Sequence, residues 1–298
     1  MKVLVTGATG LVGAALVAAL GRKHEVLRLT RGVPRSGAEL RWDPEAGALD
    51  AHALEGIDAA VHLAGESIGG RRWSASHKRR VRESRVRGTR LLCETLAALE
   101  LPPRVLVSSS AIGWYGDRGD ETLTEDSASG TGFLAEVARE WEEATAPAGD
   151  RGIRVVRMRT GIVLAARGGA LVPMRRIFGL GLGGPFGRGR QRMSWIALDD
   201  VVAAIGHCLT RDSLRGPVNA VAPGAVTQRE FARTLGRVLG RPALLPAPPM
   251  ALRLVLGREM ADALLLASQR VEPRRLLATG YAFRFPDLEP ALRHVLAR

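Results

Sequence analysis

The chain has 298 residues, of which 46% are hydrophobic, and a formal net charge of +13 at neutral pH. No apolar run reaches the 18 or more residues that a membrane-spanning helix needs, and the N-terminus lacks a signal-peptide pattern. We therefore expect a cytoplasmic protein with no membrane partner. Its only two cysteines, Cys93 and Cys208, lie far apart, which argues against a metal site or a disulfide scaffold.

The positive charge comes almost entirely from arginine, since only Lys2, Lys23 and Lys78 among the 43 basic residues are lysines. The densest basic run, 71–90, contains a single aromatic residue, Trp73. Stacking on single-stranded nucleic acid needs several interleaved aromatic rings, and the chain carries no helix-turn-helix, zinc-finger or RNA-binding pattern. We interpret the charge as compositional and do not expect a nucleic-acid partner.

Short, nearly continuous apolar runs predict five strands in the first half of the chain, at 2–7, 24–31, 58–65, 104–110 and 153–161. Helical patterns lie between them, at 13–23, 78–99 and 133–146. Strands that are apolar at nearly every position are typical of parallel sheets covered on both faces. The alternation predicts an α/β fold with a doubly wound parallel sheet and right-handed crossovers.

The pattern changes after about residue 165. A glycine-rich stretch at 176–195 predicts a mobile loop near a ligand. A helix at 198–211, a strand at 216–223 and a helix at 227–242 follow, and proline-rich 241–249 leads into a helical tail. The helix at 227–242 opens on Thr227 with Glu230 three residues later, which is the spacing of a capping box.

The strongest local motif is TGATGLVG, which places Gly7, Gly10 and Gly13 directly after the first strand and at the start of a helix. Glycines allow a tight turn and let the backbone approach a pyrophosphate, whose charge is stabilised at the helix N-terminus. In this position the motif predicts dinucleotide binding.

The end of the second strand indicates which dinucleotide binds. NAD sites usually place an acid there for the ribose 2′-hydroxyl, whereas this strand ends in Thr30 and Arg31. An arginine can pair with a 2′-phosphate, although a solvated arginine is the alternative in so arginine-rich a chain. We predict NADP (NADPH) as the cofactor.

The chain resembles the extended short-chain dehydrogenase/reductases of the sugar-epimerase type. The residues that carry the resemblance are TGATGLVG, VHLAG, the SSS of the strand at 104–110 and the WYG that follows. Further stretches, among them AGESI, SRVRGT, GLGLGGPFGRGRQRMSWIALDD and NAVAPGAVTQREFA, make it similar to the atypical branch called epimerase family proteins, which ends in a domain of unknown function. One departure is that the WIHI of that branch is Trp195 to Leu198 here, without the histidine.

The resemblance implies a Rossmann-type fold with helices on both faces of the sheet and a smaller C-terminal α/β substrate lobe. It places an NADP-binding domain at 1–165, to which parts of 190–225 return, and the lobe at 166–298, with a helical segment from about 247. It also implies that the cofactor contacts Thr9, Gly10, Leu11, Val12, Thr30, Arg31, Leu63, Ala64, Gly65 and Arg85. A plain exposed arginine is the alternative for Arg85.

In ordinary members of this superfamily, a Tyr-x-x-x-Lys pair transfers the proton, because the lysine charge brings the tyrosine pKa of about 10 closer to neutrality. Aligning Ser110 with the superfamily's serine puts Phe133 and Val137 on the tyrosine and lysine positions. Arg85 falls where an asparagine often completes the tetrad. The usual mechanism is therefore not available.

The sequence offers only weak substitutes for the missing proton donor. Tyr115 follows the strand that carries Ser110, and Glu66 and Asp117 lie on loops at the carboxyl ends of strands, where such sheets form active sites. Core or solvent-facing positions are the alternatives for these three, and His62 is expected in the core.

Two hypotheses remain open. The first is an NADP(H)-dependent oxidoreductase or epimerase that acts on a small polar substrate, for example a sugar-like one. The second is a non-catalytic NADP(H)-binding sensor or scaffold. We expect a monomer or a homodimer.

Overall fold

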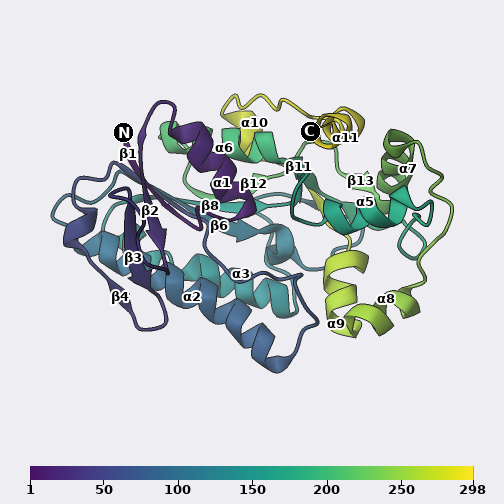
Figure 1. The fold of residues 1–298 in the computed structure, drawn as a ribbon, viewed down its shortest axis with the longest axis horizontal. Coiled ribbons are helices and arrows are strands. Elements are labelled where there is room, and N and C mark those ends of the chain that lie inside the picture. The colour runs from purple at the N-terminus through teal and green to yellow at the C-terminus, as the bar shows by residue number, and fades with distance from the viewer. Residues whose placement is uncertain (298) are drawn as a thin grey trace.

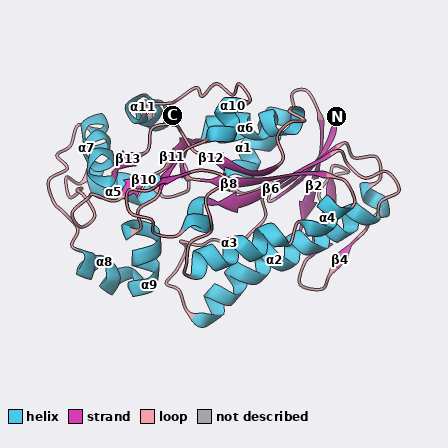
Figure 2. Cartoon of the chain, turned by 180° about the vertical axis from the view of Figure 1, so that it is seen from behind, coloured by secondary structure: helices cyan, strands magenta, loops and turns pink. Residues whose placement is uncertain are grey.

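The computed structural model describes residues 1–297. An eight-stranded sheet runs through its centre between two layers of helices (Figure 1; Figure 2). In spatial order the strands are β12 (Gly216–Ala220), β8 (Arg154–Thr160), β6 (Val105–Ala111), β5 (Ala59–His62), β1 (Lys2–Thr6), β2 (Glu25–Thr30), β3 (Glu39–Asp43) and β4 (Ala48–Leu49). All neighbours pair in parallel except β3 and β4, which are antiparallel. After β1, the strands β2, β3 and β4 are added on one side of β1, and β5 then pairs with its other side. The direction in which strands are added therefore reverses between β1 and β5.

Different helices cover the two faces of the sheet (Figure 1). One face carries α1 (Leu11–Leu20) and α6 (Leu198–Thr210), and the other carries α2 (Ala75–Ala98), α3 (Phe133–Glu143) and α4 (Ala146–Asp150), as Figure 2 also shows. Side chains of β1 alternate between the layers: Val3 and Val5 pack with Leu16 of α1, and Leu4 packs with Leu92 of α2. Both faces of the strand are buried, which explains its continuous apolar sequence.

The strands and helices predicted in the first half of the chain are all present, with ends that differ by no more than three residues. The predicted helix at 133–146 corresponds to α3, which ends at Glu143, and a separate short helix, α4, begins at Ala146. The sequence analysis missed β3 and β4, because short strands at the edge of a sheet need few apolar side chains.

The C-terminal lobe has a core of its own. Helices and short strands enclose it, namely α5 (Leu171–Gly179), α7 (Gln228–Leu239), α11 (Leu288–Leu296), β9 (Ile162–Leu164) and β11 (Trp195–Ala197). Phe178, Trp195 and Phe231 are its large buried side chains. The predicted capping box is confirmed at the start of α7: the Glu230 main-chain nitrogen donates to Thr227 Oγ1 at 3.2 Å, and the Thr227 main-chain nitrogen donates to Glu230 Oε2 at 2.7 Å.

The expectation of one glycine-rich loop over 176–195 is partly wrong. Its first residues belong to α5, and its last ones form β10 (Arg192–Met193) and the start of β11. β10 pairs with β13 (Val226–Thr227), so backbone hydrogen bonding overrides the glycine-rich composition at that end. The stretch without helix or strand is 180–191.

The helical tail begins with α8 (Pro249–Leu256) and α9 (Arg258–Ala261), followed by a π-helical turn at Asp262–Leu266 and by α10 (Arg274–Ala278). Between these helices, β14 (Arg270–Val271) pairs with β7 (Thr122–Leu123) of the segment that follows β6. This pairing brings the tail to the carboxyl end of the central sheet. Within 1–297, no helix is long and apolar enough to cross a membrane, and no group of three or more metal-ligating side chains occurs.

Candidate functional site

The glycine turn joins β1 to α1 and leaves the start of that helix open. Gly7 has a φ of 66°, which favours glycine, and its carbonyl accepts a hydrogen bond from the Gly10 nitrogen at 2.9 Å. A Cβ on Gly13 would lie 2.1 Å from the Gly7 oxygen, so the turn packs against α1 without room for a side chain. Gly10 is the N-cap, and no side chain caps the helix or places an acid in its first turn. The main-chain N–H groups of this turn can therefore bind an anion.

A buried threonine ties the glycine turn to the end of β5. Thr6 Oγ1 accepts hydrogen bonds from the nitrogens of Leu63 (3.1 Å) and Ala64 (3.2 Å). It must therefore donate its own proton to His62 Nδ1, which lies 2.7 Å away. Burial, followed by the charge of Arg85, lowers the pKa of His62 to about 4, so His62 is neutral at physiological pH. The histidine predicted to lie in the core does so, and it fixes the loop beside the glycines.

Two adjoining cavities run over this turn along the carboxyl ends of the strands. The first, of about 750 Å³, extends from the glycines to the end of β2, and the second, of about 490 Å³, extends toward β6 and α3. Both are lined by Gly7, Gly10, Leu63, Ala64 and Gly65. The structure thus brings every predicted cofactor-binding residue to one continuous groove: Thr9, Thr30 and Arg31 line the first cavity, and Leu11, Val12, Gly13 and Arg85 line the second.

The first cavity also contains carboxylates that the sequence analysis missed, because β3 was not predicted. Glu39 pairs with Arg28 at 3.2 Å, and Asp43 Oδ1 accepts main-chain hydrogen bonds at 3.0 Å. Arg31 is exposed and has no ion-pair partner in the described part of the chain. The acids of β3 are thus engaged, while Arg31 is free to meet an anion.

Arg85 lies beneath the second cavity rather than in solvent. Its Nη1 donates to the carbonyls of Glu66 (3.0 Å) and Val81 (3.1 Å), and its guanidinium lies 5.0 Å from the Trp141 ring. Burial lowers its pKa to about 10, which leaves it charged at neutral pH. The alternative of a plain exposed arginine is therefore wrong.

Ser110 is part of a buried ionic network that the sequence analysis did not foresee. Its hydroxyl donates to Glu142 Oε1 at 2.7 Å, and the same carboxylate takes two bonds from Arg159, at 2.7 Å from Nε and 2.9 Å from Nη2. The side chains of Glu142 and Arg159 are each only 3% exposed. Because the proton of Ser110 points to Glu142, the serine offers the second cavity only lone pairs.

Gln269, in the C-terminal tail, also lines the second cavity, and like Ser110 it offers the cavity only a hydrogen-bond acceptor. Its Nε2 donates to the carbonyls of Ile112 and Gly116, each at 3.0 Å. Both amide hydrogens are used, so the side-chain oxygen is the group left to accept a hydrogen bond. No sequence signal marked this residue, because only β14 brings it near β6.

Tyr115 lies in the core, where its position does not support a role as proton donor. Its side chain is fully buried, its single hydroxyl proton lies within reach of both the Thr124 carbonyl (2.9 Å) and Asn219 Oδ1 (2.7 Å), and Arg159 Nη1 donates to its oxygen at 3.1 Å. Burial raises the pKa of Tyr115. The residue lines neither of the two cavities.

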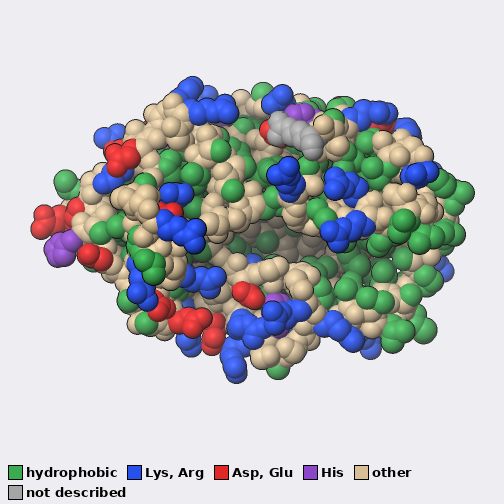
Figure 3. Space-filling model, viewed as in Figure 1, with side chains coloured by type: hydrophobic (Ala, Val, Ile, Leu, Met, Phe, Trp, Pro, Cys, Tyr) green, Lys and Arg blue, Asp and Glu red, His purple; other side chains and the backbone are tan. Residues whose placement is uncertain are grey.

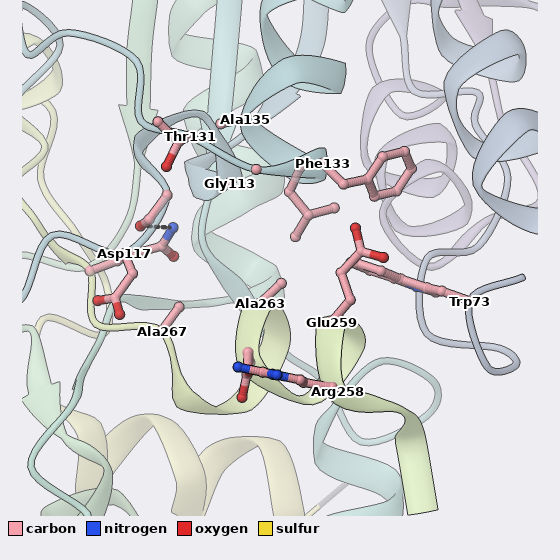
Figure 4. A pocket seen from close by; sticks show the side chains of 15 residues that line it. Trp73, Gly113, Asp117, Thr131, Phe133, Ala135, Arg258, Glu259, Ala263 and Ala267 are labelled. Atoms are coloured by element: carbon pink, nitrogen blue, oxygen red, sulfur yellow. Dashed lines mark hydrogen bonds and ion pairs between the residues drawn. The ribbon is translucent and has the colours of Figure 1, made fainter. Parts of the chain in front are cut away.

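A third cavity, of about 480 Å³, opens between the loop after β6, the start of α3 and α9 (Figure 4). It joins the second cavity through Gly113, Leu134, Ala263 and Gln269, which line both. Phe133 and Trp73 form an aromatic wall, with ring centroids 5.1 Å apart and an edge-to-face arrangement.

The residues at the usual tyrosine and lysine positions are apolar walls of this site. Val137 is 3% exposed and lines the second cavity, and Phe133 lines the third. A lysine does approach from another element: Lys78 Nζ of α2 lies 4.7 Å from the Phe133 ring centre. It is paired with Glu259 of α9 at 2.6 Å.

The two acids considered as substitutes for the missing proton donor lie in different cavities. Glu66 lines the first cavity, whereas Asp117 lines the third. Asp117 is exposed, and its Oδ1 accepts main-chain bonds from Gly119 (3.3 Å) and Ser268 (3.0 Å). The structure therefore does not bring these two carboxylates together as one acid–base pair.

The strand order, the open glycine turn and the groove at the strand switch define a Rossmann-type α/β protein of the nucleotide-binding class. The chain belongs to the NAD dependent epimerase/dehydratase family, whose model matches residues 3–220. A second model, described only as a domain of unknown function, matches residues 247–295.

Relatives match over the whole length. An epimerase family protein of Mycobacterium tuberculosis is 42% identical over 99% of this chain and 98% of its own. The crystal structure of human epimerase family protein SDR39U1 with NADPH has a TM-score of 0.93 and 38% identity, covering 100% of this chain and 99% of that one. A nucleoside-diphosphate sugar epimerase structure from Corynebacterium glutamicum has a TM-score of 0.82 and 40% identity over 99% of this chain, and the match spans 58% of that longer chain.

Proposed function

We propose that the chain binds NADP(H) in the continuous groove and acts as an oxidoreductase or epimerase on a small polar molecule. One observation carries the cofactor assignment: an uncapped helix start over a glycine turn shares one groove with an unpaired Arg31. The human relative crystallised with NADPH supports it. On this proposal 1–165, with parts of 190–225, holds the cofactor, and the lobe at 166–298 completes the substrate site together with residues of 1–165.

The residues of the groove fit this cofactor. The glycine turn would hold the pyrophosphate, Arg31 the 2′-phosphate, and the second cavity the nicotinamide beside Ser110 and Val137. When bound, the nicotinamide supplies or accepts a hydride. The third cavity adjoins this end and would hold the substrate against Phe133 and Trp73.

The polar groups near the nicotinamide end favour a substrate that donates hydrogen bonds. Ser110 Oγ and the Gln269 side-chain oxygen are both acceptors, because their hydrogens are already engaged. They would bind the hydroxyl of an alcohol better than the oxygen of a carbonyl. The substrate hydroxyl proton would pass to Ser110 as the serine proton moves to Glu142, a step that the Arg159 charge disfavours.

The network of Ser110, Glu142 and Arg159 also favours a second candidate function, a non-catalytic NADP(H)-binding sensor or scaffold. No group in the described groove offers a proton in the way the Tyr-x-x-x-Lys pair does. Titration with NADPH, followed by an assay of NADP⁺ reduction across a panel of small alcohols and sugars, separates the two. Binding without turnover supports the sensor, turnover supports the enzyme, and absence of NADPH binding contradicts both.

Arg31→Asp is expected to weaken NADPH binding by roughly 10- to 100-fold, because a charge-assisted hydrogen bond is lost and a repulsive carboxylate is introduced. The affinity for NADH should stay the same or rise. Isothermal titration with both cofactors measures the change. Arg22→Asp, at an exposed position outside the groove, is the matched control. Equal NADPH affinity in the Arg31 variant would refute this role.

Replacing Phe133 with Tyr and Val137 with Lys together is expected to restore proton transfer. General acid catalysis typically contributes about 10²–10⁴-fold, so partial recovery should exceed the background rate of NADPH oxidation with small aldehydes and diketones. Phe133→Tyr combined with Val137→Met keeps the volume without the charge and serves as the control. A double variant that folds, binds NADPH and remains inert would show that the missing pair is not what limits catalysis.

A further inference from the structure

Large apolar side chains gather at the end of the C-terminal lobe, over α8 and the loops beside it (Figure 3). The eight-residue α8, PMALRLVL, has no buried residue. Six side chains of this area are each between 53% and 81% exposed: Leu180, Leu182, Leu244, Leu245, Met250 and Leu254. Monomeric proteins rarely expose so many large apolar side chains together, so this area is expected to meet a partner.

Backbone hydrogen bonds make the area one continuous surface. The Leu245 nitrogen donates to the Gly183 carbonyl at 3.2 Å, and the Ala247 nitrogen donates to the Pro185 carbonyl at 2.9 Å. These bonds place the loop after α5 alongside the segment that precedes α8. We call the six side chains, with the arginines described next, the apolar-basic face.

The unpaired charge of this face has a single sign. No aspartate or glutamate occurs at 151–198 or 231–258. Five exposed arginines in or next to these loops form no ion pair within 1–297: Arg175, Arg176, Arg188, Arg190 and Arg241. The arginine of α8, Arg253, is paired with Asp262 at 2.8 Å, so the strip formed by α8 is apolar while its surroundings are basic.

The combination of exposed apolar side chains with unpaired arginines indicates which kind of partner this face binds. A second copy of the chain would bring like charges together, and protein interfaces are usually anchored by aromatic residues, which this set lacks. A lipid surface with anionic headgroups is uniformly negative and accepts leucine and methionine at the boundary of its acyl chains. We propose that the apolar-basic face docks peripherally on an anionic lipid bilayer. This proposal replaces the expectation of no membrane partner, which rested on the lack of a spanning helix, because peripheral docking needs none. It is independent of the proposed function.

The test is co-sedimentation of the full chain with vesicles of phosphatidylcholine alone or mixed with phosphatidylglycerol. We expect binding to the anionic vesicles only, weakened by high salt. Met250→Glu with Leu254→Glu should lower it roughly tenfold or more, because two apolar side chains no longer enter the lipid. Leu101→Glu, at a 72% exposed site between α2 and β6, should not change it. Both positions in the double variant are exposed, so its thermal unfolding midpoint should match that of the parent.

Several results would overturn the proposal. They are no binding of the parent chain to anionic vesicles, equal binding of the Met250/Leu254 variant, or equal loss in the Leu101 control. If light scattering shows a dimer that only the Met250/Leu254 variant loses, with no vesicle binding, the occupant is a second copy instead. Arg175→Gln with Arg176→Gln gives an independent check, because it should reduce the salt dependence of binding while the apolar strip stays intact.

Discussion

Replacing Glu142 with alanine is expected to lower the free energy of unfolding by about 3–5 kcal/mol, since removing one partner of a buried ion pair leaves the other charge uncompensated. Glu142 and Arg159 are each 3% exposed and joined by two short hydrogen bonds. The variant also removes the acceptor of the Ser110 proton. Urea denaturation measures the loss.

Glu143→Ala is the matched control, because the neighbouring carboxylate on α3 is exposed. Its effect should stay within about 0.5 kcal/mol. Glu142→Leu combined with Arg159→Met should recover part of the stability lost in Glu142→Ala, because no unpaired charge then remains buried. Ser110, Glu142 and Arg159 belong to β6, α3 and β8. If the single variant is as stable as the parent, their network does not hold these elements together.

Replacing Gly13 with alanine is expected to destabilise the protein by about 1–3 kcal/mol and to weaken NADPH binding at least tenfold. The new Cβ would lie 2.1 Å from the Gly7 oxygen, so the glycine turn must move away from α1. That movement displaces the N–H groups proposed to hold the pyrophosphate. Thermal unfolding and NADPH titration on the same preparation measure both effects.

Gly206→Ala is the control for this prediction. Gly206 is also a helical glycine, in α6, but nothing lies within 4 Å of its added Cβ. Alanine favours the helix there by about 0.5–1 kcal/mol, so stability should rise and NADPH affinity should not change. A Gly13 variant that behaves like the Gly206 variant would contradict the close approach of turn and helix.

The role of Ser110 follows from the residues around it rather than from its place in the sequence. In the usual tetrad a serine can donate to a carbonyl oxygen, whereas here Glu142 takes its proton. The two amide hydrogens of Gln269 are likewise engaged, by the carbonyls of Ile112 and Gly116. The groove can therefore hold a cofactor while offering the substrate mainly acceptors.

The sequence by itself determined the parts of this protein that depend on local pattern. Buried parallel strands must be apolar on both faces, so β1, β2, β5, β6 and β8 could be predicted along with the helices between them. The glycine spacing after β1 and the absence of an acid at the end of β2 indicated the groove and its proposed cofactor, since both lie within the continuous segment β1–α1–β2.

Only the tertiary structure decided which distant residues meet. Glu142 lies 32 residues from Ser110 and Arg159 lies 17 residues from Glu142, and no local pattern links them. Tyr115 was considered as a substitute proton donor because it follows the right strand, with a core position as the alternative, and the turn after β6 directs it into the core. The pairing of β14 with β7 brought Gln269 to the groove across 157 residues of chain. Contacts of this range depend on how elements pack, which the period of a single segment does not encode.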